Sequence, residues 1–107
     1  MLILTCDGTD TQFLAALNRQ TGKVVWKTVR THFKERATPL PLMAYSTPLV
    51  VVVDGVPQIV SSAADHAAAY DAQTGREIWW LRYDGFSEVF RPVTWRGLVF
   101  LQGFENV

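Results

Sequence analysis

Asp65-His66 is the adjacent pair of side chains best suited to chemistry in this sequence, because a carboxylate beside an imidazole can serve as a general base or bind a metal ion. The pair falls in a predicted turn between two strands. A polar hairpin corner accounts for both residues, and we favour that interpretation. The other histidine, His32, has no cysteine or carboxylate at the spacing of a metal site. We therefore predict no catalytic residue and no metal-binding residue in this chain.

Two aspartates near the N-terminus, Asp7 and Asp10, flank Gly8 and Thr9 and give a weak indication of calcium binding. The twelve-residue pattern of a calcium loop is absent, so we do not predict a calcium site there. The sequence also has no arrangement of nucleophile, histidine and aspartate, no phosphate-binding loop and no dinucleotide fingerprint. Known catalytic motifs thus give no positive indication of an enzyme.

Three basic residues, Arg30, Lys34 and Arg36, lie near Phe33 in a long segment between predicted strands. They could contact an anion or a protein partner. Glu35 interrupts the cluster, however, and a solvated loop accounts for the basic residues equally well.

The composition indicates one folded, sheet-rich domain, since 49% of the 107 residues are hydrophobic and 12% are aromatic. Ten basic and ten acidic residues leave no net charge, which removes the main electrostatic argument for binding nucleic acid or an anionic membrane. Cys6 is the single cysteine, so no disulfide can form within the chain. No apolar run is long enough for a membrane span, and Met1–Leu4 is too short for a signal peptide.

An internal repeat organises the chain. The stretch from Ala16 to Trp26 returns from Ala69 to Trp79, and the glycines of the two copies are 53 residues apart (75 − 22). Each copy reads as a strand, a tight turn and a second strand. An Asn or Asp at the turn entrance can accept bonds from nearby backbone N–H groups, and the Gly at the exit supplies a residue with positive φ.

The repeated pattern Ala-x-Asp/Asn-x-x-Thr-Gly-Lys/Arg-x-x-Trp resembles the tryptophan-docking motif of the quinoprotein (PQQ-like) β-propeller repeat. This resemblance implies an all-β fold, a partial β-propeller of antiparallel four-stranded blades. It also implies that each Trp lies between the Ala of its own blade and the turn Gly of the adjacent blade. The matching residues are Ala16, Asn18, Thr21, Gly22, Lys23 and Trp26 in the first copy, and Ala69, Asp71, Thr74, Gly75, Arg76 and Trp79 in the second.

Nine strands are expected along the chain, in sets of three, four and two. Residues 1–29 are then the end of one blade, 47–83 a complete blade and 91–107 the start of the next. The whole chain, residues 1–107, is a piece of a propeller, which closes with roughly four to eight such blades. The strands are expected at 2–5, 13–17, 23–29, 49–53, 58–62, 67–70, 76–82, 92–95 and 98–102.

Quinone chemistry does not follow from the resemblance. Quinoprotein dehydrogenases hold the cofactor against a Trp and adjacent cysteines, with Ca²⁺ beside it, whereas this chain has one cysteine and no recognisable ligand set. We therefore predict no cofactor-binding residue and no cofactor. Blade docking explains Trp26 and Trp79, and ordinary packing explains Trp80 and Trp95.

The favoured function is a non-catalytic scaffold or protein-interaction module, similar to the propeller lipoprotein of the outer-membrane β-barrel assembly machine. The alternative is a fragment of a PQQ-dependent dehydrogenase whose active-site residues lie outside this chain, with PQQ and calcium as its cofactors. The expected partners are another protein or the remaining propeller blades. The resemblance also implies that the parent protein works in the periplasm or cell envelope.

Uncovered blade faces and strand edges are expected at both ends of such a piece. Exposed edges pair with other chains, and zero net charge offers little repulsion against association. The isolated chain is therefore expected to self-associate, with Val99, Phe100 and Leu101 contributing most.

Overall fold

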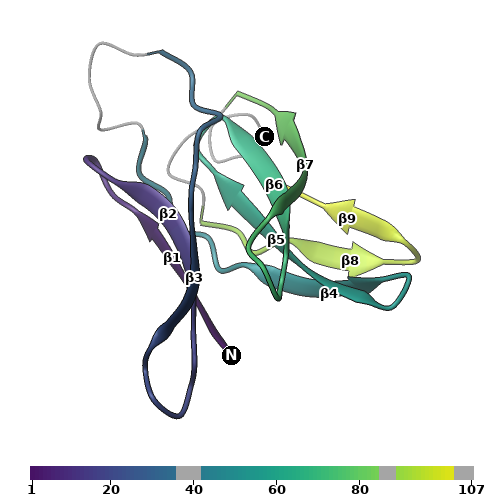
Figure 1. Ribbon diagram of the computed structural model, residues 1–107. Coiled ribbons are helices and arrows are strands. Elements are labelled where there is room, and N and C mark those ends of the chain that lie inside the picture. Colours follow the sequence, from purple (N-terminus) through teal and green to yellow (C-terminus); the bar gives the residue numbers. More distant parts are fainter. Residues whose placement is uncertain (36–41, 85–88, 103–107) are drawn as a thin grey trace.

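The structure is a computed structural model that describes residues 1–35, 42–84 and 89–102. Its described part contains nine β-strands in three separate antiparallel sheets (Figure 1). The first sheet has the order β1-β2-β3, the second β4-β5-β6-β7 and the third β8-β9. The strands are β1 (Leu2–Asp7), β2 (Gln12–Leu17), β3 (Val24–Val29), β4 (Leu49–Val53), β5 (Val56–Ala63), β6 (His66–Asp71), β7 (Glu77–Arg82), β8 (Val93–Trp95) and β9 (Leu98–Phe100).

The strands agree with those expected from the sequence in number and position, and their ends differ by one to a few residues. Each sheet is a meander in which consecutive strands pair. This topology follows from the short turns, because a tight turn can join only antiparallel neighbours. The prediction of an all-β fold is therefore confirmed.

The two repeated turns have the same hydrogen bonds. In the first turn, the Asn18 side chain accepts bonds from the backbone N–H groups of Gln20 (2.9 Å) and Thr21 (3.1 Å). The backbone N–H of Gly22 donates to the Asn18 carbonyl at 2.8 Å, and Gly22 has φ +73°. In the second turn, Asp71 makes the equivalent bonds, at 2.8 Å to the N–H of Gln73 and 3.1 Å to that of Thr74, and Gly75 has φ +74°. The sequence repeat is thus a repeat of backbone geometry.

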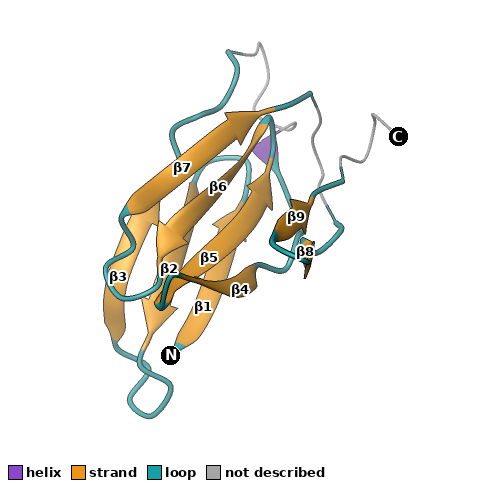
Figure 2. Ribbon diagram, turned by 90° about the vertical axis from the view of Figure 1, so that its right-hand side faces the viewer, coloured by secondary structure: helices purple, strands orange, loops and turns teal. Residues whose placement is uncertain are grey.

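The first two sheets pack face to face, and Figure 2 shows one behind the other. The core between them comes from both sheets. Alternate residues of β5 and β6 face the first sheet, and the intervening ones face the other way, as strand geometry requires. The buried cluster consists of Leu14, Ala16, Trp26, Ile59, Ala68, Tyr70 and Ala72, with Ile3 packed against it.

Two expectations about burial are wrong. The continuous apolar run of β4 predicts a strand buried on both faces, but Val50 and Val52 are 57% and 67% exposed. Trp95, which was assigned to ordinary packing, is 60% exposed. Both differences have one cause. No element of the described residues packs over these side chains of β4 or over the β8–β9 hairpin, so they are left uncovered.

Replacing Trp26 by Ala should destabilise the fold by about 3–5 kcal/mol, because it empties a buried site between the sheets. The matched change Trp95→Ala should cost less than about 1 kcal/mol, since that ring is largely in solvent. Urea unfolding of both variants measures the two losses. Equal losses would contradict the assignment of Trp26 to the core.

Candidate functional site

Trp26 and Gly75 make a contact, called the joint below, that connects the first two sheets. The Trp26 indole N–H donates to the carbonyl of Ala72 at 3.0 Å, and the ring lies against Gly75. A Cβ added to Gly75 would stand 2.4 Å from the Trp26 ring, so only glycine permits this approach. The hydroxyl of Thr28 donates to the Gly75 carbonyl at 2.6 Å. Residues of β3 therefore bind the β6–β7 turn through two hydrogen bonds and one close packing contact.

The second tryptophan of the repeat stands at the equivalent position of its own sheet. Trp79 pairs with Ala69 as Trp26 pairs with Ala16, and the register shifts next to the alanine in both sheets. Of the glycines in the described residues, only Gly75 has a tryptophan against it. Trp79 is half-buried, and no turn glycine in the described part of the chain lies against its ring.

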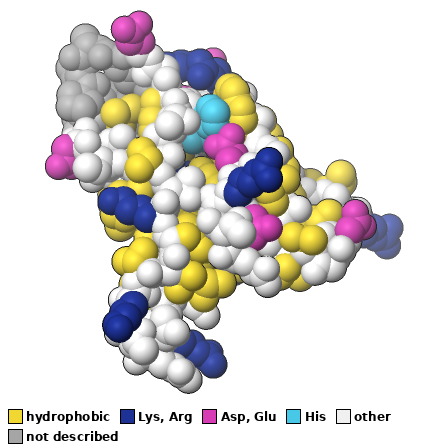
Figure 3. Space-filling model, viewed as in Figure 1, with side chains coloured by type: hydrophobic (Ala, Val, Ile, Leu, Met, Phe, Trp, Pro, Cys, Tyr) yellow, Lys and Arg dark blue, Asp and Glu magenta, His cyan; other side chains and the backbone are white. Residues whose placement is uncertain are grey.

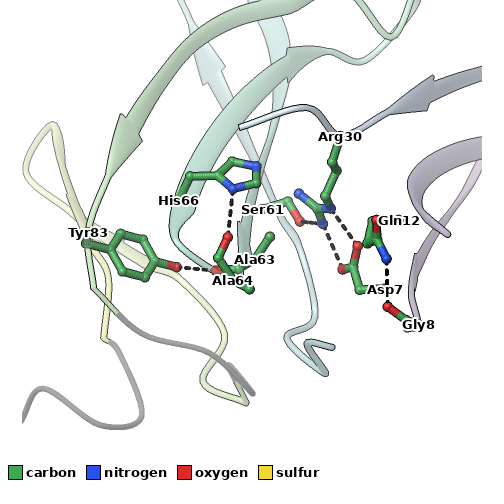
Figure 4. Close-up of polar contacts among 9 residues, drawn as sticks. All are labelled: Asp7, Gly8, Gln12, Arg30, Ser61, Ala63, Ala64, His66 and Tyr83. Atoms are coloured by element: carbon green, nitrogen blue, oxygen red, sulfur yellow. Dashed lines mark hydrogen bonds and ion pairs between the residues drawn. The ribbon is translucent and has the colours of Figure 1, made fainter. Parts of the chain in front are cut away.

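The contact region between the first two sheets, called the seam below, also holds a buried ion pair of Arg30 and Asp7 (Figure 4). Arg30, just after β3, is 4% exposed and binds both carboxylate oxygens of Asp7 at 2.7 and 3.0 Å. Its Nη2 atom also donates to the hydroxyl of Ser61, on β5, at 2.7 Å. A solvated loop is therefore the wrong interpretation for Arg30. Arg30 follows the third strand of the first sheet, and Asp7 ends the first strand of the same sheet. The spacing of the two residues in the sequence does not reveal that they pair.

His66 is buried and held as one tautomer. Its Nδ1 atom lies 2.8 Å from the carbonyl of Ala64, which can only accept, so Nδ1 carries the proton (Figure 4). The Nε2 atom of His66 and the Nη1 atom of Arg30 are both buried without a hydrogen bond. Burial is the main cause that lowers the pKa of His66 to about 4; the Ala64 bond opposes this shift, and the positive charge of Arg30 contributes to it.

Asp65 is also fully buried, and its carboxylate accepts the backbone N–H of Lys34 at 2.8 Å. Asp65-His66 lies at a hairpin turn, as the sequence predicts, and both side chains are buried. The cause is the segment after β3, which folds over this turn and brings Phe33 edge-on to the ring of His66, at 5.0 Å between centroids.

His32 finds a carboxylate far along the sequence. Its Nε2 atom lies 2.7 and 2.8 Å from the two carboxylate oxygens of Glu77, and its ring stacks on Trp80 with centroids 3.9 Å apart. The residues near His32 in the sequence give no sign of Glu77, because the two residues are 45 positions apart. The contact is again between the segment after β3 and the second sheet.

The ionisable side chains described in this seam bind other groups of the protein. The seam's carboxylates are engaged by Arg30 and His32, and burial raises the pKa of Asp7 despite the opposing effect of its ion pair with Arg30. No group of three or more His, Cys, Asp or Glu side chains that could hold a metal ion occurs among the described residues. Arg36 lies outside them.

A known protein family matches most of this chain. A family model described as outer membrane protein assembly factor BamB, of the PQQ type of repeat, matches residues 10–106. The chain belongs to this family. The three sheets of the BamB-like chain are accordingly β-propeller blades or parts of blades. No individual curated protein matches the sequence. In the part of the chain that the structure describes, no helix is long and apolar enough to span a membrane.

Gly75→Ala should destabilise this BamB-like chain more than Gly22→Ala. Both changes force a side chain into a positive-φ backbone, which costs about 1–2 kcal/mol each. Only Gly75→Ala also collides with Trp26, because a Cβ at Gly22 would meet nothing within 4 Å. The extra loss should be about 1–3 kcal/mol in denaturant unfolding. Equal losses for the two alanine variants would show that the joint is not tight.

The unfolding free energy should fall by about 2 kcal/mol between pH 7 and pH 5 through His66 alone. Its pKa is about 4 in the folded chain and near 6.5 when unfolded, so the unfolded chain takes up the proton first. This contribution is fully present above pH 6.5 and is lost as the pH falls toward 4. Urea unfolding at both pH values should show that the unfolding free energy of the His66→Gln variant falls less between pH 7 and pH 5 than that of the wild-type chain. If the variant and the wild-type chain lose the same free energy, other groups cause the pH dependence.

Proposed function

We propose that the chain is a non-catalytic propeller segment that acts as a scaffold and binds another protein through uncovered strands. The observation that carries this proposal is an open groove of about 370 Å³ between β4 and the β8–β9 hairpin. It lies along an edge strand, whose outward backbone groups can pair with an extended segment of a partner. Its lining is mostly apolar: Val50, Val51, Val52, Val53, Thr94, Gly97, Leu98 and Val99.

The face shown in Figure 3 supports an interaction role, since hydrophobic side chains lie open between scattered charges over much of it. Contiguous apolar surface on a soluble domain marks a site of protein association. The family description names an outer membrane protein assembly factor. We therefore place the parent protein in the cell envelope and take its partner to be a β-strand-rich envelope protein.

The polar groups of the seam argue against catalysis in this segment. Arg30 binds Asp7 of β1 and Ser61 of β5, and His32 binds Glu77 of β7. The bonds to Ser61 and Glu77 connect the two sheets. The lone Cys6 and these engaged carboxylates do not fit the cysteine pair and calcium set that PQQ requires in quinoprotein dehydrogenases. Under the alternative function, PQQ and calcium would have to be held by residues outside this chain.

The purified chain should reduce no dye when mixed with PQQ, Ca²⁺ and an alcohol or sugar. The reason is that the described carboxylates of the seam are already paired and that Cys6 is the single cysteine of the sequence. Dye reduction that rises in proportion to protein concentration, and that requires PQQ, would instead favour the dehydrogenase alternative.

A binding measurement tests the interaction role directly. Immobilised chain should bind a urea-unfolded outer-membrane β-barrel protein after dilution, and Val52→Lys should weaken the binding at least about fivefold by placing a charge on the apolar edge. The control Val24→Lys changes an equally exposed valine away from the groove and should leave binding unchanged. Equal effects of the two lysine variants would contradict the placement of the binding site at the groove.

A further inference from the structure

Three buried polar atoms in the seam have no hydrogen-bond partner among the described residues. They are Nη1 of Arg30, Nε2 of His66 and the hydroxyl of Tyr70. The three residues are 4%, 0% and 1% exposed, so bulk solvent does not reach these atoms. Buried polar groups nearly always bind a protein group or an ordered water molecule, because an unpaired one is costly. Three such atoms close together would indicate one shared ligand.

The strand register places the three side chains around one small residue, Ala68. His66, Ala68 and Tyr70 alternate along β6, so they share the face that packs on the first sheet. Ser61 of β5 pairs with Ala68, and Nη2 of Arg30 donates to the Ser61 hydroxyl at 2.7 Å. The guanidinium of Arg30 therefore lies next to Ala68, with His66 on one side along the strand and Tyr70 on the other.

Electrostatic effects confirm that Arg30 is close to both neighbours. Its positive charge contributes to the lowered pKa of His66, and it opposes the rise that burial causes in the pKa of Tyr70. Figure 4 shows the imidazole of His66 turned toward the guanidinium of Arg30.

Two aromatic rings enclose Ala68 on its remaining side. Trp80 of β7 pairs with Ala68, and its ring stacks on that of His32 with centroids 3.9 Å apart. The ring of His32 also meets that of His66 edge-on, at 5.5 Å between centroids. Ala68 is fully buried and contributes only a methyl group. A small residue thus lies at the centre of the three polar side chains.

We propose that one buried water molecule lies over Ala68 and joins Arg30, His66 and Tyr70. The guanidinium can only donate, and Nε2 of His66 can only accept because Nδ1 carries the proton. A water molecule accepts from Arg30 and donates to His66, and it binds the Tyr70 hydroxyl, which can do either. About three polar partners are usual for a buried water molecule.

The charges around Ala68 favour a neutral ligand over an ion. Asp7 already balances the charge of Arg30, and a further anion would also meet the negative charge of Glu77, which acts on Tyr70. A cation would be repelled by Arg30 and could not accept its N–H. Water supplies a donor and an acceptor and has no charge to desolvate.

The water molecule would add a second polar connection between the first two sheets. Arg30 follows β3, whereas His66 and Tyr70 belong to β6. The direct bond from Arg30 reaches only Ser61 on β5. The bridge through water extends this connection to the neighbouring strand, and it completes the hydrogen bonds of the buried layer.

The Tyr70→Phe variant tests the proposal through the sign of its effect on stability. If the hydroxyl binds the water molecule, its removal breaks a hydrogen bond, and the equilibrium constant for unfolding in urea should rise about fivefold. If the hydroxyl has no partner, its removal relieves a buried unpaired group, and the constant should fall. Tyr83→Phe sets the scale, because the Tyr83 hydroxyl donates directly to the Ala63 carbonyl at 2.9 Å. An unfolding constant of Tyr70→Phe at or below that of the wild-type chain would overturn the proposal.

Relaxation dispersion of ¹⁷O in water detects the bound molecule itself, because it responds to water that stays in the protein longer than the protein tumbles. Ala68→Val puts an isopropyl group where the water molecule lies, so this variant should lose one long-lived water molecule. The matched control Ala67→Val changes an equally buried alanine on the opposite face of β6 and should keep the wild-type number.

The same number of long-lived water molecules in Ala68→Val and the wild-type chain would overturn the proposal, and so would an equal loss in both valine variants. Either result would do so even if Tyr70→Phe is destabilised, since that loss would then belong to a direct bond. If Ala68→Val does not fold, the sign of the Tyr70→Phe effect decides.

Discussion

The packing of the first two sheets depends on glycine, which has no side chain, at position 75. An indole ring can lie on the β6–β7 turn only where no Cβ stands, and the left-handed backbone of that turn also favours glycine. Trp26 fills the space and binds the carbonyl of Ala72. The contact fixes how the first blade sits on the second, and the core residues on either side of the seam depend on that placement.

A second constraint comes from the charges buried beside this joint. Isolated, Arg30 or Asp7 would be costly to bury, but together with Ser61 they satisfy most of each other's hydrogen bonds. His66 stays neutral in the same layer, where its Nε2 atom and the Nη1 atom of Arg30 are left without partners. The layer thus joins two blades, and the lowered pKa of His66 predicts that acid destabilises it.

The repeat accounts for what could be predicted from the sequence. Local turn chemistry at Asn18 and Asp71 and alternating apolar residues place the strands, and the matching copies indicate blades. The polar layer was not predictable, because Arg30 meets Asp7 and Ser61 only after the strands have paired and the sheets have packed. Likewise, the apolar run of β4 indicates a strand but cannot say that its faces are left uncovered.

The contact between Trp26 and Gly75 can be measured directly by NMR in the folded chain. If the contact exists, nuclear Overhauser effects join the indole protons of Trp26 to the α protons of Gly75, and the ring shifts those α protons upfield. The contact also predicts slow exchange of the Trp26 indole N–H, which is bonded to Ala72, and fast exchange of that of the exposed Trp95. Gly75 α protons at ordinary shifts, together with equally fast exchange of both indoles, would contradict it.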